Sequence, residues 1–155
     1  MNEVFAIVRL RGSVKTSKYI NDTLEMLRLK KVNHCVIVPQ TPQYEGMIKK
    51  VRDYVTYGEI DKKTLVELLR KRGRIEKNQL LTEDALKEIT GFENFEKFAD
   101  ALMKNSVKLK DFKKIKPFFR LNPPRKGFKS IRLPYPRGDL GYRGEKINIL
   151  LERMM

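Results

Sequence analysis

The sequence predicts an α+β fold in which two helices pack on one face of a small sheet, followed by a helical insert and a basic extension rich in proline and glycine. Over the first sixty residues, short β-branched runs alternate with helical apolar periodicity, in the order strand, helix, strand, helix, strand. After residue 107 the apolar residues thin out. We therefore expect a core domain at 1–60, a helical extension at 61–106 that includes an acidic insert, and a basic arm at 107–155.

The elements of the core follow from apolar runs and helix-start signals. Ser17 is a good N-cap, and Thr41 followed by Pro42 combines an N-cap with proline at the first helical position. The apolar residues that follow each cap recur at helical spacing, so each helix buries one face. The expected elements are a strand at 4–10, a helix at 17–29, a strand at 35–38, a helix from Thr41-Pro42, and a strand at 55–57 closed by Gly58.

Three further helices and one strand are expected after the core. Asp61, Thr82 and Asn94 are the predicted N-caps, and Gly73 and Gly91 are placed to end the first two helices. The last two helices carry the acidic insert, residues 73–103. The apolar run at 147–151 predicts a C-terminal strand that returns to the sheet.

The charge of the chain is large and unevenly placed. The formal net charge is +15, and residues 104–143 contribute +11 of it through thirteen cations and two acids, whereas residues 73–103 carry −3. Such a concentration predicts a nucleic-acid or anionic-membrane partner. No apolar run is long enough for a spanning helix, and the start of the chain lacks the features of a signal peptide. We therefore expect a cytoplasmic protein that binds nucleic acid, not a membrane.

Aromatic residues lie among the cations of the arm, where they offer faces for unpaired bases while the cations neutralise phosphates. Arg125-Lys126-Gly127-Phe128 begins like an RNA-recognition box, but Lys129 and Ser130 break the match, which argues against sequence-specific readout. Phe118 and Phe119 have the alternative role of packing against the domain. The candidate binding residues are Arg11, Lys15, Ser17, Lys18, Arg28, Lys49, Lys50, Arg120, Arg125, Lys126, Phe128, Lys129, Arg132, Tyr135, Arg137, Tyr142 and Arg143.

The sequence offers little chemistry for catalysis. His34 and Cys35 are the single histidine and cysteine. His34 directly precedes the expected buried strand and Cys35 begins it, so a structural role is favoured over a nucleophilic pair. One histidine and one cysteine cannot form a zinc site of the usual spacing, and no phosphate-binding glycine motif occurs. We expect no catalytic residues, no metal, no cofactor and no small-molecule substrate.

Four segments of the chain together form a recognisable pattern. They are Thr41-Pro42 with Gly46-Met47-Ile48 and Val51, Thr23-Leu24 with Leu27-Arg28-Leu29, Tyr57-Gly58-Glu59-Ile60, and Pro-Pro-Arg-Lys-Gly-Phe at 123–128. In these segments the chain resembles the large-subunit ribosomal protein thirty family, whose eukaryotic counterpart is large-subunit protein seven. The resemblance covers nearly the whole chain and is closest to the archaeal type. It implies a βαβαβ core similar to a reduced ferredoxin-like fold with a three-stranded antiparallel sheet, and no catalytic site.

The resemblance also implies a structural role in the large ribosomal subunit, bound to large-subunit rRNA near the 5S rRNA and beside neighbouring ribosomal proteins. Two other functions stay open: an RNA-processing protein with a basic domain that holds substrate, and an architectural protein that compacts DNA. We expect the arm to be disordered in the free protein, because charge repulsion and scarce apolar area do not offset the entropy of ordering. The acidic insert is expected to face solvent or a neighbouring protein.

Overall fold

The computed structural model describes residues 4–12 and 14–155, so residues 1–3 and 13 of the predicted core lie outside the described part. The central sheet contains β1 (Val4–Arg9), β2 (His34–Pro39) and β3 (Val55–Glu59), with β1 antiparallel to both neighbours. Two-residue strands extend both edges, giving the order β4-β2-β1-β3-β5. The α+β class and the antiparallel core are therefore confirmed.

The remaining elements are α1 (Lys18–Met26), α2 (Pro42–Val51), α3 (Lys62–Arg72), α4 (Glu83–Thr90), α5 (Phe95–Met103), β4 (Phe119–Arg120), β5 (Gly141–Tyr142) and α6 (Ile147–Met154), with short 3-10 turns at Glu76–Asn78, Leu109–Asp111 and Gly144–Lys146.

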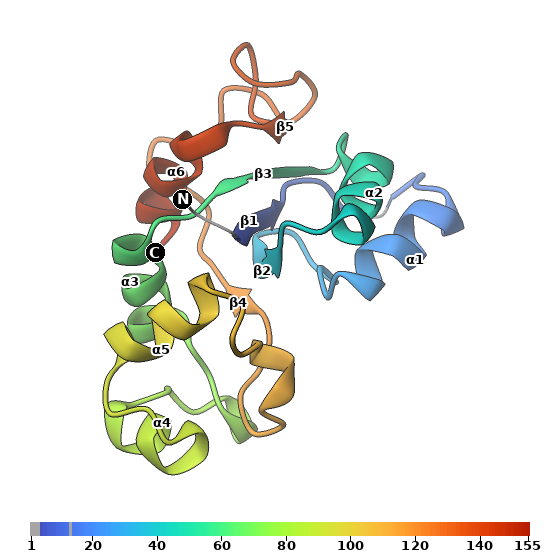
Figure 1. Cartoon of the computed structure of the whole chain (residues 1–155). Helices are drawn as coiled ribbons and strands as arrows, with labels where there is room; N and C mark the ends of the chain where they lie inside the picture. The colour runs from blue at the N-terminus through green and yellow to red at the C-terminus, as the bar shows by residue number, and fades with distance from the viewer. Residues whose placement is uncertain (1–3, 13) are drawn as a thin grey trace.

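Helices cover both faces of the sheet (Figure 1). On one face, Phe5 and Ile7 of β1 pack with apolar residues of α1 and α2. On the other face, Ala6 and Val8 pack with residues of α3, α5 and α6. Successive side chains of a strand point to opposite faces, which is why all six residues of β1 are buried. The two predicted helices on one face are present, and the later helices build a second apolar layer.

The predicted helix starts are confirmed by their hydrogen bonds. Ser17, Thr41, Asp61, Thr82 and Asn94 each accept a bond from the backbone N–H three residues later. Gly91 ends α4 in the left-handed conformation, with φ of +83°. The first helix, however, ends at Met26 and not at residue 29, because Arg28 takes a left-handed φ of +65° and turns the chain toward β2.

The predicted C-terminal strand at 147–151 is wrong, because these residues form the first part of helix α6. A short apolar run fits a buried helix as well as a strand. The helical spacing of the buried residues Ile147, Leu150, Leu151 and Met154 shows which applies.

The edge of β3 is also occupied by β5, where Thr56 and Tyr57 pair with Gly141 and Tyr142. The third strand likewise continues past Gly58, which was expected to close it, as far as Glu59.

The basic segment, residues 104–143, packs against the core at several points, while its expected disorder in the free protein stays a prediction. It supplies β4 at one edge of the sheet and β5 at the other. Phe119 is 1% exposed, and Ile115, Leu121 and Leu140 are buried with it. The segment cannot form a core of its own, but single apolar residues along it join the core built by the helices and sheet. No helix in the described part of the chain is long and apolar enough to span a membrane.

Candidate nucleic-acid interface

The positive charge of the basic segment is hardly neutralised by the protein itself. Among the described residues there are three ion pairs, and only Arg143–Asp139 uses a cation of the 104–143 segment. The other twelve Lys and Arg side chains of that segment therefore have no carboxylate within 4 Å in the described structure. A polyanion that brought phosphates close to such cations would relieve their mutual repulsion.

The candidates from the first half of the chain lie around α1 and α2. Lys15, Lys18, Arg28, Lys49 and Lys50 are exposed, whereas Arg11 is half-buried. The Lys50 ammonium lies 5.0 Å from the ring centre of Tyr19, so a cation of α2 lies against α1. The Ser17 hydroxyl accepts a bond from the N–H of Ile20 at 3.3 Å, so its first role is to cap α1.

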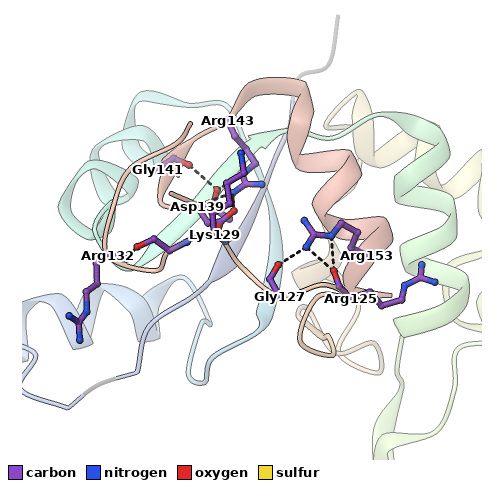
Figure 2. Close-up of polar contacts among 10 residues, drawn as sticks. Arg125, Gly127, Lys129, Arg132, Asp139, Gly141, Arg143 and Arg153 are labelled. Carbon is purple, nitrogen blue, oxygen red and sulfur yellow. Dashed lines mark hydrogen bonds and ion pairs between the residues drawn. The ribbon is translucent and has the colours of Figure 1, made fainter. Parts of the chain in front are cut away.

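The arginines and lysines of the 120–137 stretch form a second exposed group. Arg132 and Arg137 lie in the loop between β4 and β5, and Figure 2 shows Arg132 pointing away from the Asp139–Arg143 pair. The Arg120 guanidinium lies 5.9 Å from the ring centre of Phe118. The remaining members, Arg125, Lys126 and Lys129, are also exposed.

Arg143, also a candidate for RNA contact, is only 8% exposed, and its guanidinium bonds other groups of the protein (Figure 2). Its guanidinium donates to the Thr56 hydroxyl at 2.9 Å, to the Asp139 carboxylate at 2.8 Å and to the Asp139 carbonyl at 3.0 Å. It also lies 5.1 Å from the ring centre of Tyr135. These contacts join the long loop to β3, so we leave Arg143 out of the proposed RNA-contact set.

Asp139 gives the loop its shape. One oxygen of its carboxylate accepts the N–H groups of Lys129 and Ser130, and the other accepts from Arg143. Backbone bonds close the same loop: the Asp139 N–H donates to the Ser130 carbonyl at 2.9 Å, and the Tyr135 N–H to the Leu140 carbonyl at 2.9 Å. The exposed cations Lys129, Arg132 and Arg137 thus lie on a loop whose backbone is held by these hydrogen bonds.

Arg153 on α6 holds the start of that loop and was missed at the sequence level. Its guanidinium donates to the Arg125 carbonyl at 2.9 and 2.7 Å and also to the Gly127 carbonyl (Figure 2). This role was not predicted, because residues 147–151 were expected to form a strand and not a helix. In a helix, Lys146, Ile149, Leu150 and Arg153 follow i, i+3, i+4, i+7 spacing and share one face, and this spacing is the signal that could have revealed it.

The three candidate rings differ in exposure. Tyr142 is 51% exposed, and its ring centre lies 5.4 Å from that of Tyr57. Its hydroxyl donates to the Glu59 carboxylate at 2.6 Å, and this bond, together with partial burial, raises the pKa of Tyr142 to about 12. Phe128 and Tyr135 are half-buried beside α6 and Arg143. Tyr142 therefore offers the largest open ring surface of the three.

His34 and Cys35 lie inside the fold. The His34 imidazole stacks on Phe118 at 5.1 Å between ring centres and is 7% exposed. The Cys35 thiol is fully buried, which raises its pKa far above the usual range and keeps it protonated. Among the described residues, no group of three or more His, Cys, Asp or Glu side chains is arranged to hold a metal ion.

The stability of the fold is expected to fall as the pH drops below the ordinary histidine pKa of 6.5. Burial, and then the charges of Arg120, Lys31 and Arg9, lower the pKa of His34 in the folded protein. The unfolded chain therefore takes up the proton first, so this stabilisation is complete above pH 6.5 and is lost toward the lower folded pKa. Urea unfolding between pH 8 and pH 5 measures the effect. Since His34 is the only histidine, His34→Gln should flatten this part of the curve, and an unchanged pH dependence would contradict the expectation.

Comparison with known proteins gives a consistent family. Residues 5–55 match the model of the ribosomal protein L30p/L7e family. The chain is similar to the large ribosomal subunit protein uL30 of Archaeoglobus fulgidus, with 54% identity over 151 residues that cover 97% of this chain and 99% of the relative. It is 52% identical over 154 residues to the protein of the same name from Methanococcus maripaludis, and 49% identical over 152 residues to that from Methanoculleus marisnigri. Each of these matches covers 97% of this chain and 99% of the relative.

Proposed function

We propose that this chain, which belongs to the ribosomal protein L30p/L7e family of large ribosomal subunit proteins, binds large-subunit rRNA through two basic surfaces and has a structural role without catalysis. Its archaeal relatives place it in the cytoplasmic ribosome. The first surface, the helix surface, consists of Arg11, Lys15, Lys18, Arg28, Lys49 and Lys50. The second surface, the loop surface, consists of Arg120, Arg125, Lys126, Lys129, Arg132 and Arg137.

The observation that carries the proposal is a set of cations without ion-pair partners on a folded loop and on the strand β4 that precedes it. Every member of the loop surface is exposed, and none forms an ion pair with a described residue. Asp139 and Arg153 fix the backbone of this loop from within. A charged surface of fixed shape binds folded RNA by neutralising phosphates and by matching the RNA contour, without reading base edges.

The affinity for large-subunit rRNA is expected to fall steeply with salt. If about six cations meet duplex-like phosphates, the plot of log K against log salt has a slope of about −5, because each contact contributes about −0.9. Replacing Arg132 and Arg137 by Gln should make the slope shallower by about 2. Filter binding of the full chain at several salt concentrations measures this.

The matched control for that experiment lies in the acidic insert. Lys87 and Lys97 are exposed there, and Gln at both positions removes the same charge without touching either basic surface. The control should keep the slope of the unaltered protein. An affinity that barely changes with salt would overturn the proposal, and equal affinity for bulk duplex DNA would favour an architectural DNA-binding protein instead.

We further propose that the bound rRNA lies near the 5S rRNA and that the acidic insert faces away from RNA, toward a neighbouring basic protein or solvent. Residues 73–103 carry seven acids and four cations. Phosphates would be repelled by this charge. Chemical cross-linking within intact large subunits tests both points: cross-links from the insert to rRNA in preference to protein would contradict the orientation.

A further inference from the structure

A cleft of about 610 Å³ lies between the loop at 126–139 and one face of α6. Its volume is within the roughly 300–1,000 Å³ range of small-ligand sites in proteins. Three lysines and three apolar or aromatic side chains among its lining residues give it a distinct chemistry: Lys126, Lys129, Lys146, Phe128, Tyr135 and Ile149.

The three lysines supply positive charge that is not used within the protein. Their ammonium groups form no hydrogen bond or ion pair with any described residue, and all three are exposed. The carboxylate in the lining, Asp139, is buried and already paired with Arg143 at 2.8 Å. The entrance of the cleft therefore attracts an anion, and no free carboxylate of the lining opposes it.

The other part of the lining is aromatic and aliphatic. Phe128 and Tyr135 are half-buried, so their rings are anchored, while Ile149 is 52% exposed on the α6 face. The Arg143 guanidinium lies 5.1 Å from the ring centre of Tyr135 and restrains that ring. Rings of this kind, held in place beside lysines, suit a planar base attached to a phosphate.

Both sides of the cleft are fixed by hydrogen bonds. The loop side is held by the Asp139 carboxylate, which accepts from the N–H groups of Lys129 and Ser130. The helix side is joined to the loop by Arg153, whose guanidinium binds the Arg125 and Gly127 carbonyls. A cleft whose two sides are fixed beforehand binds its ligand with a smaller ordering cost.

We infer that this cleft receives one unpaired nucleotide of the large-subunit rRNA, with its phosphates near the three lysines and its base against Phe128, Tyr135 and Ile149. The inference rests on the proposed rRNA binding and makes it more specific. It adds two residues to the interface: Lys146, which directly precedes α6, and Ile149 of α6. It also requires a nucleotide that leaves its stack, because the face of a stacked, paired base is covered by its neighbours and cannot lie against these side chains.

Chemical probing of base reactivity in large-subunit rRNA, with and without the full chain, tests the inference. The unaltered protein should protect an unpaired base in addition to backbone positions. Ile149→Asp places a carboxylate in the cleft, so it should restore the reactivity of that base, leave the backbone footprint in place and weaken binding about tenfold. Ile131→Asp is the matched control, because Ile131 is 40% exposed on the same loop and does not line the cleft.

A second variant keeps the test independent of helix stability. Lys146→Gln keeps a long polar side chain and should make the salt slope shallower by about 0.9 while weakening protection of the same base. If the backbone footprint is present but no base changes reactivity in Ile149→Asp or Lys146→Gln, the inference is overturned and the proposed function stands. If the unaltered protein leaves no footprint on rRNA, both are overturned.

Discussion

Asp139→Asn is expected to lower the free energy of unfolding by about 3–5 kcal/mol, the usual cost of removing one member of a buried ion pair. The side chains of Asp139 and Arg143 are 7% and 6% exposed. The substitution leaves the buried Arg143 charge without a counter-ion. The groups around this carboxylate are hydrogen-bond donors: the N–H groups of Lys129 and Ser130 on one side and the Arg143 guanidinium on the other. The NH₂ of asparagine must face one of these donors, and neither can accept its hydrogen bond. Urea unfolding followed by circular dichroism measures the loss.

Glu93→Gln is the matched control for this prediction. Glu93 and Lys97 form an ion pair with the same four-residue spacing and the same length, 2.8 Å, but their side chains are 69% and 59% exposed. Water and salt screen an exposed pair, so its removal should leave the free energy of unfolding nearly unchanged. Equal stability of Asp139→Asn and Glu93→Gln would show that burial of the Asp139–Arg143 pair does not govern the stability of the loop.

The double variant Asp139→Asn/Arg143→Met separates charge from shape. Methionine removes the unpaired charge and fills similar space, so the double variant should be more stable than Asp139→Asn alone. Recovery is expected to be incomplete, because Arg143 also donates to the Thr56 hydroxyl at 2.9 Å. If the double variant is less stable than Asp139→Asn, the unpaired charge is not the main cost.

The parts of the fold that the sequence predicts correctly are those with local signals. Ser17, Thr41, Asp61, Thr82 and Asn94 start helices because their short polar side chains bond the first free N–H groups of the helix. The strand at Val4–Arg9 is apolar on both faces, and it lies between two helix layers. Neither inference needs knowledge of distant residues.

The parts that the sequence does not predict depend on contacts between distant segments. The strands β4 and β5 contain two residues each, too few for any periodicity, and they exist because Phe119 pairs with Cys35 and Gly141 with Thr56. The buried pair Asp139–Arg143 looks in sequence like two charges in a polar loop. The run at 147–151 fits a strand by composition, and it becomes a helix because its buried residues pack at helical spacing on α3 and β3.

The candidate RNA-binding residues show the same division. Exposed cations such as Arg132 and Arg137 are found by composition, because surface lysines and arginines need no tertiary partner. Arg143 is chosen by the same rule, although the fold buries it. Lys146 and Ile149 are overlooked because their shared face exists only once 147–154 is a helix. Composition thus identifies the kind of surface, while packing decides which side chains belong to it.

Gly58→Ala is expected to lower the free energy of unfolding by about 3 kcal/mol, at the upper end of the usual cost of overpacking a core. A methyl group on Gly58 would lie 2.0 Å from the Gly144 carbonyl oxygen and 3.1 Å from the Ile147 side chain. The neighbour in the way is backbone, in a turn where Gly144 has a left-handed φ of +57°. To make room, the start of α6 must move away from β3. That movement also strains the bonds from the Asn148 amide to the Glu59 and Glu145 carbonyls, at 3.2 and 2.9 Å.

Gly46→Ala makes the same chemical change at a site with open space and isolates the effect of the close approach. Gly46 lies within α2, where an added methyl group meets nothing within 4 Å. There alanine should raise the free energy of unfolding by about 0.5–1 kcal/mol, because it favours the helix and restricts the unfolded chain. Thermal and urea unfolding of the two variants should therefore shift in opposite directions from the unaltered protein. If Gly58→Ala were as stable as Gly46→Ala, the close approach of Gly58 to the Gly144 carbonyl would not determine how the start of α6 packs against β3.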